Sequence, residues 1–331
     1  MRHGLAISIL AALAALPIAA REAPAGIPAA VEAVRSRLDP VLLTYDLLVE
    51  PGKDVTLEAA WKSGLRLQGV EGKRLRFRLG DKLLGQAATD KDGHAAVPWK
   101  VPDGPGDYVI TVRVDPADQP PRPVPDGRIL VAARKADVKL AVVDLDKTLV
   151  ASGFERVLVG GAKPMEGAGV VVGRLAEDHT IVYLTHRPDL LAPESKAWLA
   201  DNGFPAGPLL TSTLASLVGG SGAFKSERLE AIRKTYANVL VGIGDKISDA
   251  RAYAQNGARA ILILHVNWAK DDPQYFDKLA DQIDALPDPV EVVTNWAQVA
   301  DVLFAKAHQA KGAMAKRLRD VAAELRQHGG D

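Results

Sequence analysis

The sequence predicts two tandem domains: an all-β immunoglobulin-like sandwich over residues 38–136 and an α/β domain with a doubly wound parallel sheet over residues 137–305. The length of 331 residues exceeds that of one usual domain and lets each half bury its own core. Before Asp137, short apolar runs alternate with turn signals, whereas after it strands alternate with helical stretches. This change of pattern sets the boundary.

The composition is that of a globular protein and removes several classes of function. Hydrophobic residues make up 47% of the chain and charged residues 25%. The 41 basic residues balance 41 acidic ones, so no net field favours a nucleic-acid partner, and we expect none. Because the chain contains no cysteine, disulfides, zinc-thiolate sites and cysteine nucleophiles are excluded.

The amino-terminal residues predict export. Basic side chains precede an apolar run from Leu5 to Leu16, and small residues follow it before Arg21. The run is short for a membrane span, although an uncleaved anchor remains the alternative. We therefore expect a cleaved signal peptide at residues 1–20, a linker at residues 21–37, and a periplasmic or secreted protein.

The sandwich domain is expected to contain seven strands, with Gly, Pro and Asp in the turns between them. These strands cover residues 42–49, 54–61, 73–79, 82–88, 95–100, 107–114 and 128–134. The segments 72–80 and 88–95 resemble bacterial immunoglobulin-like surface domains, which are structural or adhesive modules. Asp90, Asp92 and His94 could be imagined as metal ligands, but a turn between two strands explains them, so we assign no catalysis to this domain.

The stretch from Leu140 to Val150 carries the chemistry of the second domain. Leu140–Val143 is a short apolar run typical of a central parallel strand, and Asp144 and Asp146 follow it. Ligands bind at this edge of an open α/β sheet. Alternation puts the two carboxylates on one side, where their repulsion requires a cation between them or a proton on one of them. A simple turn after a strand is the alternative interpretation.

Two further predicted strands end in polar residues. The strand 179–185 ends at Thr185, whose hydroxyl could hold an anionic oxygen, and the strand 239–243 is followed by Asp245 and Asp249. The glycines beside Asp245 would let the backbone pass close to a ligand. Lys225 begins a helix after a Gly-rich loop and could neutralise a phosphoryl oxygen or a carboxylate. Taken singly, each has a plain alternative as a strand end, a helix cap or a solvated surface residue.

The remaining elements complete the α/β pattern. Helices are expected at residues 168–176, 189–202 and from 224 onward, with a fourth strand at 260–265 and a last strand-helix unit at 290–304. Residues 306–331 are basic and helical in pattern. We expect this tail to pack weakly or to stay solvated, and a membrane-surface role for it is a minor alternative.

Taken together, the order and spacing of these residues resemble the haloacid dehalogenase (HAD) superfamily of phosphohydrolases over about residues 138–305. The four motifs of that superfamily match Asp144-Leu145-Asp146-Lys147-Thr148, Thr185, Lys225, and Gly244-Asp245 through Asp249. The resemblance implies a Rossmann-like fold. Because the segments between the motifs are too short for a large separate cap domain, a capless, open site is expected.

The resemblance also implies a role for each matched residue. Asp144 is expected to attack phosphorus and become an aspartyl phosphate, while Asp146 moves the proton. The resemblance implies a Mg²⁺ ion, which prefers carboxylate oxygens. Its expected ligands are Asp144, the main-chain carbonyl of Asp146, Asp245 and Asp249. Lys225 and Thr185 are expected to stabilise the oxygens of the phosphoryl group in transfer.

Closer motifs resemble the lipin-type phosphatidate phosphatase branch, which pairs an immunoglobulin-like region with such a catalytic domain. They are residues 183–188, 204–210, 224–225 and 242–253. The sequence departs from that branch at two places. Thr185-His186-Arg187 replaces a Ser-rich segment, and Asp245 replaces an Asn that is frequent there. These departures affect the expected lipid headgroup more than the expected hydrolysis. We therefore expect a phosphatase for phosphatidate or another bulky phosphomonoester, with peripheral membrane contact. The alternatives are a phosphatidate-binding or envelope-binding protein without turnover.

Overall fold

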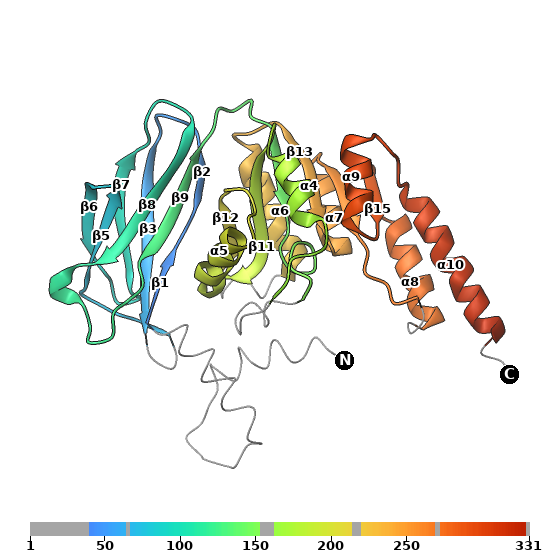
Figure 1. Cartoon of the computed structure of the whole chain (residues 1–331), viewed down its shortest axis with the longest axis horizontal. Helices are drawn as coiled ribbons and strands as arrows, with labels where there is room; N and C mark the ends of the chain where they lie inside the picture. The colour runs from blue at the N-terminus through green and yellow to red at the C-terminus, as the bar shows by residue number, and fades with distance from the viewer. Residues whose placement is uncertain (1–39, 64–66, 153–161, 214–219, 269–271, 329–331) are drawn as a thin grey trace, which may run out of the picture. The chain divides into compact units, whose positions relative to one another are not determined.

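A computed structural model describes residues 40–63, 67–152, 162–213, 220–268 and 272–328 (Figure 1). The predicted signal peptide and linker lie outside these residues. The chain divides into two compact units. The first takes the residues up to Arg134 together with Asp189–Trp198, and the second takes Lys135–Ser152, Lys163–Pro188 and the chain from Leu199 onward. Asp189–Trp198, which the sequence analysis placed in the α/β domain, thus groups with the first unit.

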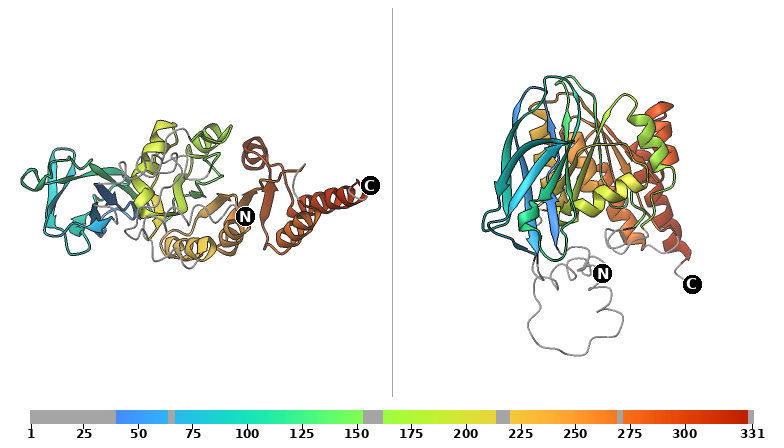
Figure 2. Two further views of the ribbon diagram at one scale, coloured as in Figure 1. Left: turned by 90° about the horizontal axis from the view of Figure 1, so that it is seen from below. Right: turned by 60° about the vertical axis from the view of Figure 1, so that its left-hand side comes forward.

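The first unit contains a two-sheet β-sandwich (Figure 2). One sheet is antiparallel and comprises β1 (Val41–Thr44), β3 (Asp54–Ser63), β4 (Gln68–Gly69) and β7 (His94–Lys100). The other has the order β2 (Leu47–Val49), β9 (Gly127–Ala133), β8 (Gly106–Val114), β5 (Arg74–Leu79) and β6 (Lys82–Ala88). Alternate residues of both sheets, such as Leu57, Phe77 and Ile110, form a shared buried core. The immunoglobulin-like assignment stays a prediction.

The single strand predicted at residues 42–49 is wrong, because the chain changes sheets within it. β1 pairs with β3, whereas β2 pairs in parallel with β9 in the other sheet. Asp46 lies at the crossing, where its buried carboxylate accepts the backbone N–H of Leu130 at 2.7 Å. The side chain thus satisfies a donor that the interrupted ladder leaves open, an interaction that no local pattern reveals.

The second unit is built on a six-stranded sheet in which every pairing is parallel. Its order is β12 (Leu209–Ser212), β11 (Thr180–Pro188), β10 (Leu140–Val143), β13 (Val239–Gly244), β14 (Arg259–Ile263) and β15 (Val290–Val293). Numbered within this sheet, the order is 3-2-1-4-5-6, that of a doubly wound sheet. The strand order reverses between β10 and β13, and ligands bind outside the carboxyl ends of the strands at such a point.

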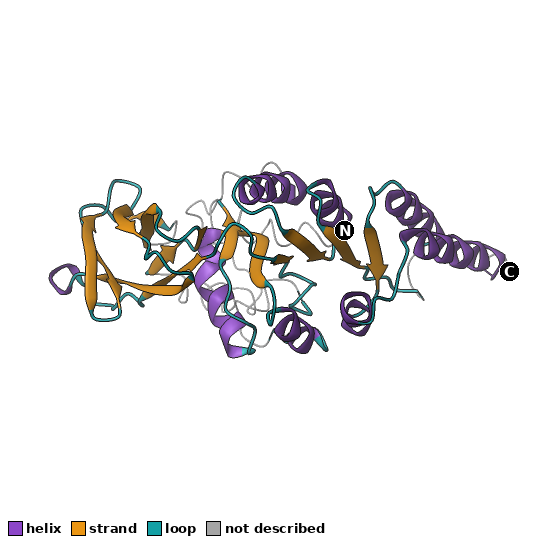
Figure 3. Ribbon diagram, turned by 90° about the horizontal axis from the view of Figure 1, so that it is seen from above, coloured by secondary structure: helices purple, strands orange, loops and turns teal. Residues whose placement is uncertain are grey.

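Helices connect these strands (Figure 3). Helix α4 (Ala168–Leu175) packs on α9 (Trp296–Phe304), and α6 (Gly220–Arg233) packs on α7 (Ile247–Gln255). A short 3₁₀ turn at Asp189–Leu191 leads into α5 (Ala192–Asp201). The strand β12 and the helix α8 (Pro273–Asp284) are absent from the sequence prediction. No helix among the described residues has the length and apolar character needed to cross a membrane.

The prediction that the carboxyl-terminal helix packs weakly is wrong. Helix α10 (Lys311–His328) lies along α8 and buries Met314, Ala315, Leu318 and Ala322. On the outer side, Arg319 forms ion pairs with two aspartates of α8. The strong amphipathic pattern of α8 supplies the apolar partner that the tail alone does not show.

Candidate active site

The loop after β10 brings Asp144 to the carboxyl edge of the sheet and is held in place from several sides. Leu145 is fully buried, and its carbonyl accepts the backbone N–H groups of Leu149 and Val150. Trp296, the first residue of α9, donates its indole N–H to the carbonyl of Thr148 at 2.9 Å. The ring Nε2 of His265 donates to the carbonyl of Lys147 at 2.6 Å. The loop is therefore fixed by its own backbone bonds to Leu145, by α9 and by the segment after β14.

Lys225 is fully buried and lies between two carboxylates. Its Nζ is 2.7 Å from Oδ1 of Asp144 and 2.7 Å from Oδ2 of Asp249. The alternative of a solvated surface lysine is thus wrong. Burial by itself would lower the pKa of Lys225, but Asp144 and Asp249 raise it well above its usual value. The side chain is therefore a permanent cation between two potential phosphate-handling carboxylates.

The glycines beside Asp245 serve helix packing. A Cβ at Gly242 would lie 2.2 Å from the ring of Tyr253, and one at Gly244 would lie 2.9 Å from Asp249. The two glycines thus let α7 approach β13 closely, a role that the sequence did not predict; their expected closeness to a ligand stays a prediction. This approach places Asp249, in the first turn of α7, beside Lys225 and fully buries it.

Asp144, Asp245 and Asp249 form the one group of potential metal ligands found among the described residues. One oxygen from each lies within 4.8 Å of the others. Oδ1 of Asp245 is buried and has no hydrogen-bond partner within the described part of the chain. Three hard oxygen donors, one of them unsatisfied, fit a divalent cation of the Mg²⁺ type.

The electrostatics of this group also favour a cation. Burial, opposed by Lys225 and reinforced by Asp249 and Asp146, raises the pKa of Asp144 to about 6. Burial together with Asp144 and Asp249 raises the pKa of Asp245 to about 7. One lysine does not balance three neighbouring carboxylates, so a further positive charge would stabilise their ionised forms.

The carboxylate of Asp146 pairs with a different side chain from that of Asp144. The Asp146 carboxylate is bound through both oxygens by Arg187, with Nε to Oδ2 at 3.0 Å and Nη2 to Oδ1 at 2.7 Å. The Arg187 side chain is almost completely buried, whereas that of Asp146 is partly exposed. Sequence reasoning missed this contact. Its signal was alternation in the strand, which puts Arg187 on the same side of β11 as Thr185.

Thr185 lies two residues past Tyr183, which pairs with Val143 of β10, so it is at the same edge of the sheet as Asp144. It is buried, and its hydroxyl accepts the backbone N–H of Arg187 at 3.3 Å. No bond among the described residues joins this hydroxyl to the carboxylates. The structure therefore brings Asp144, Lys225, Asp245 and Asp249 together and leaves Thr185 on the adjacent strand.

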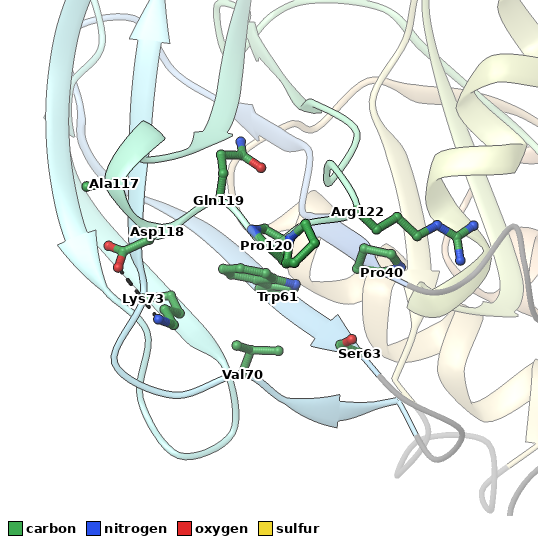
Figure 4. A pocket seen from close by; sticks show the side chains of 11 residues that line it. Pro40, Trp61, Ser63, Val70, Lys73, Ala117, Asp118, Gln119, Pro120 and Arg122 are labelled. Carbon is green, nitrogen blue, oxygen red and sulfur yellow. Dashed lines mark ion pairs between the residues drawn. The ribbon is translucent and has the colours of Figure 1, made fainter.

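A separate cavity of about 550 Å³ lies within the first unit (Figure 4). Trp61, Val70 and several prolines line it, with Lys73, Asp118 and Arg122 among the polar residues. None of the predicted site residues contributes to it. Asp90, on this unit, accepts the backbone N–H groups of Asp92 and His94, which is the turn expected for this segment. All the predicted site residues therefore belong to the second unit.

Comparison with known families supports this location. The model of the LNS2 domain of the PITM 1-3 proteins matches residues 141–266. The match covers every candidate site residue but less than half of the chain. This domain is related to lipin-type phosphatases of the HAD kind. No curated protein matches the sequence.

Similarity to solved structures is weak. The D00-D0 domain of Intimin aligns with a TM-score of 0.23 and 15% identity over 28% of this chain and 46% of that one. A β-glucuronidase of Bifidobacterium dentium aligns with a TM-score of 0.28 and 11% identity over 77% of this chain and 44% of that one. The chain thus spans less than half of either protein. Scores at this level carry no argument for fold or function.

Proposed function

We propose that the protein is a Mg²⁺-dependent phosphohydrolase of the HAD type that forms an aspartyl phosphate on Asp144. The observation that supports this most is the position of Lys225 between Asp144 and Asp249, with Asp245 beside them, at the switch point of a parallel sheet. A dianionic phosphoryl group needs positive charge close to the attacking carboxylate, and this group of residues supplies it.

In the proposed reaction an oxygen of Asp144 bonds to phosphorus while the bond to the leaving oxygen breaks. Asp146 gives its proton to that oxygen and later takes one from the water that hydrolyses the aspartyl phosphate. Lys225 and Thr185 stabilise the charge on the transferred group. Arg187 is a positioning residue in this scheme, because its bidentate contact fixes the direction of the Asp146 carboxylate.

Asp144, Asp245, Asp249 and the main-chain carbonyl of Asp146 would hold the metal ion. When bound, Mg²⁺ supplies charge neutralisation for the phosphoryl oxygens. The unsatisfied Oδ1 of Asp245 and the raised pKa values of Asp144 and Asp245, both caused first by burial, support this assignment.

Phosphatidate or another bulky phosphomonoester is the proposed substrate. The match of residues 141–266 to a domain related to lipin-type phosphatases supports this class, as do the short segments between the motifs, which favour an open site. We propose a periplasmic or secreted location on the basis of the amino-terminal sequence pattern, and peripheral membrane contact on the basis of the proposed lipid substrate.

Phosphate release from phosphatidate vesicles and from an aryl phosphate, each with Mg²⁺ and with EDTA, tests the proposal. We expect release that requires Mg²⁺ and is lost in Asp144→Asn. Asp46→Asn is the matched control, since it changes a buried aspartate of the other unit. If neither ester releases phosphate, the proposed phosphatase activity is excluded. Binding to the vesicles without release of phosphate would then support the alternative of a lipid-binding protein. Phosphate release from the aryl phosphate alone would exclude phosphatidate as the substrate.

A further inference from the structure

Two exposed lysines directly follow carboxylates of the proposed site. Lys147 follows Asp146 in the loop after β10, and Lys246 follows Asp245 after β13. β10 and β13 are neighbouring strands, so both lysines lie at the same edge of the sheet. Within the described part of the chain, neither forms an ion pair. Both ammonium groups are accessible from solvent, and the charge of Lys246 also lowers the pKa of Asp245 against the larger effect of burial.

The backbone of Lys147 allows a substitution by glycine that removes the side chain without straining the loop. Its φ is +55°, in the left-handed region that glycine adopts without strain and that L-residues adopt only at a cost in free energy. The hydrogen bond from His265 to its carbonyl and the contacts of Leu149 and Val150 with Leu145 hold the loop in this form. Leu67 and Lys306 also have a positive φ, so the conformation does not by itself assign a role to the Lys147 side chain, but it makes glycine the least disturbing replacement for this lysine.

The reacting phosphoryl group already has its own cation. Lys225 is buried beside Asp144, and Arg187 is engaged by Asp146. Lys147 and Lys246 are exposed instead, so they lie outward from the buried carboxylates. Their charge is therefore available to a part of the substrate beyond the phosphoryl group that is transferred.

We propose that Lys147 and Lys246 form a subsite for a second anionic group located next to the phosphomonoester. This inference rests on the proposed function and narrows its substrate class. The second anion has two possible sources. It can belong to the leaving group of the same molecule, as a carboxylate or a second phosphate, or to anionic headgroups that surround a lipid phosphate in a membrane.

A matched pair of soluble esters tests the first source. Phenyl phosphate and 4-carboxyphenyl phosphate differ by one negative charge on the leaving group. In Lys147→Gly and in Lys246→Ala, the ratio of kcat/KM for the carboxy ester to that for the plain ester should fall roughly three- to tenfold at low ionic strength. Salt should reduce the same ratio in the wild type. The ratio cancels general effects on catalysis.

Vesicles test the second source. Phosphatidate is presented in vesicles of phosphatidylcholine, either alone or with added phosphatidylglycerol. The rate of phosphate release with phosphatidylglycerol is divided by the rate without it, and this ratio is compared between the wild type and the variants. A fall of this ratio in the variants assigns the second anion to neighbouring lipids, whereas a fall of the ester ratio assigns it to the substrate itself.

Lys234→Ala is the matched control, because Lys234 is exposed in the same unit but precedes β13 and so lies at the opposite edge of the sheet. It should leave both ratios unchanged.

Lys147→Gly should also melt at the same or a higher temperature, since glycine relieves the left-handed strain, and a lower melting temperature would contradict that argument. If both ratios stay constant in both site variants while phosphate is released, the subsite is excluded and the phosphatase stands. If no substrate reacts with the wild type, the proposed function fails first.

Discussion

Each of the two units contains a buried or half-buried lysine that binds a buried aspartate, and the surroundings of the two lysines differ. In the first unit, Nζ of Lys196 lies 2.7 Å from Asp46, 2.9 Å from the carbonyl of Arg128 and 3.2 Å from the carbonyl and the hydroxyl of Thr44. Among the described residues the ammonium group of Lys196 meets one carboxylate, and neutral oxygens accept its other hydrogen bonds. In the second unit, Lys225 meets two carboxylates, and a third is close by.

The difference separates a structural ion pair from a site prepared for a ligand. The contacts of Lys196 satisfy its donors and leave no excess charge. The carboxylates around Lys225 are in excess, and the raised pKa values of Asp144 and Asp245, which burial causes first, report the free energy of keeping them ionised. Buried charge is therefore informative about function when it is unbalanced, and much less so when it is paired.

The largest expected effect follows from removing the nucleophile. Asp144→Asn should lower phosphate release by on the order of 10⁴-fold or more, because the amide cannot form the aspartyl phosphate. Its melting temperature should stay the same or rise, since one of three repelling carboxylates is gone. Asp46→Asn, at the other lysine, should do the reverse: normal release and lower stability. Equal loss of activity in both variants would contradict the comparison.

Replacing each lysine by methionine tests the two surroundings directly. Lys225→Met should reduce release by about 10²- to 10³-fold and destabilise the metal-free protein by about 3 kcal/mol, because Asp144 and Asp249 lose their cation. Added Mg²⁺ should restore part of this stability. Lys196→Met should cost about 2 kcal/mol, discounted for its partial exposure, and Mg²⁺ should restore none of it. Urea unfolding with and without Mg²⁺ provides the measurement; equal metal responses would refute the distinction.

The excess of carboxylates also predicts a pH dependence in EDTA. Burial raises the folded-state pKa of Asp144 to about 6 and that of Asp245 to about 7, whereas an unfolded aspartate titrates near ~3.9. Between these values the folded state binds more protons, so stability must fall as pH rises from about 4 to about 7, by roughly 1.4 kcal/mol for each unit by which burial raises a pKa and therefore by several kcal/mol in all. Asp245→Asn should flatten this profile. If the free energy of unfolding in EDTA instead rises between about pH 4 and about pH 7, the protein's own cations already compensate the charge of these carboxylates.

The smallest of the four effects concerns Arg187, a third buried cation, which binds the carboxylate of Asp146. Arg187→Met should lower kcat about tenfold with little change in KM, because Asp146 loses its direction but substrate binding is untouched. Arg187→Lys should recover only part of the loss, since lysine cannot make the bidentate contact. Arg319→Met is the control, because Arg319 contacts two aspartates on the surface of α8. A purely structural role for Arg187 would lower stability and leave kcat intact.

Local pattern was enough to predict the strands that carry Asp144, Thr185 and Asp245, because each is an apolar run that ends in a polar residue. It was not enough for Arg187, whose partner is 41 residues away, or for the sheet change at Asp46, whose partner Leu130 is 84 residues away. Strand β12 was missed because only four residues form it, after a Pro- and Gly-rich segment. The tail helix α10 was misjudged because its buried face is defined by α8. The functional roles of the site residues stay predictions.

The hydrogen bond from Trp296 to the carbonyl of Thr148 joins residues 148 positions apart and has a consequence for the order of assembly. Closing so long a loop is entropically costly and comes late in folding. The loop that bears Asp144 and Asp146 therefore gains its last anchor only after α9, the helix that follows the final strand of the sheet, has docked. A chain cut before Trp296 should therefore lack one of the contacts that fix the position of Asp144, even where β10 and its neighbouring strands have formed.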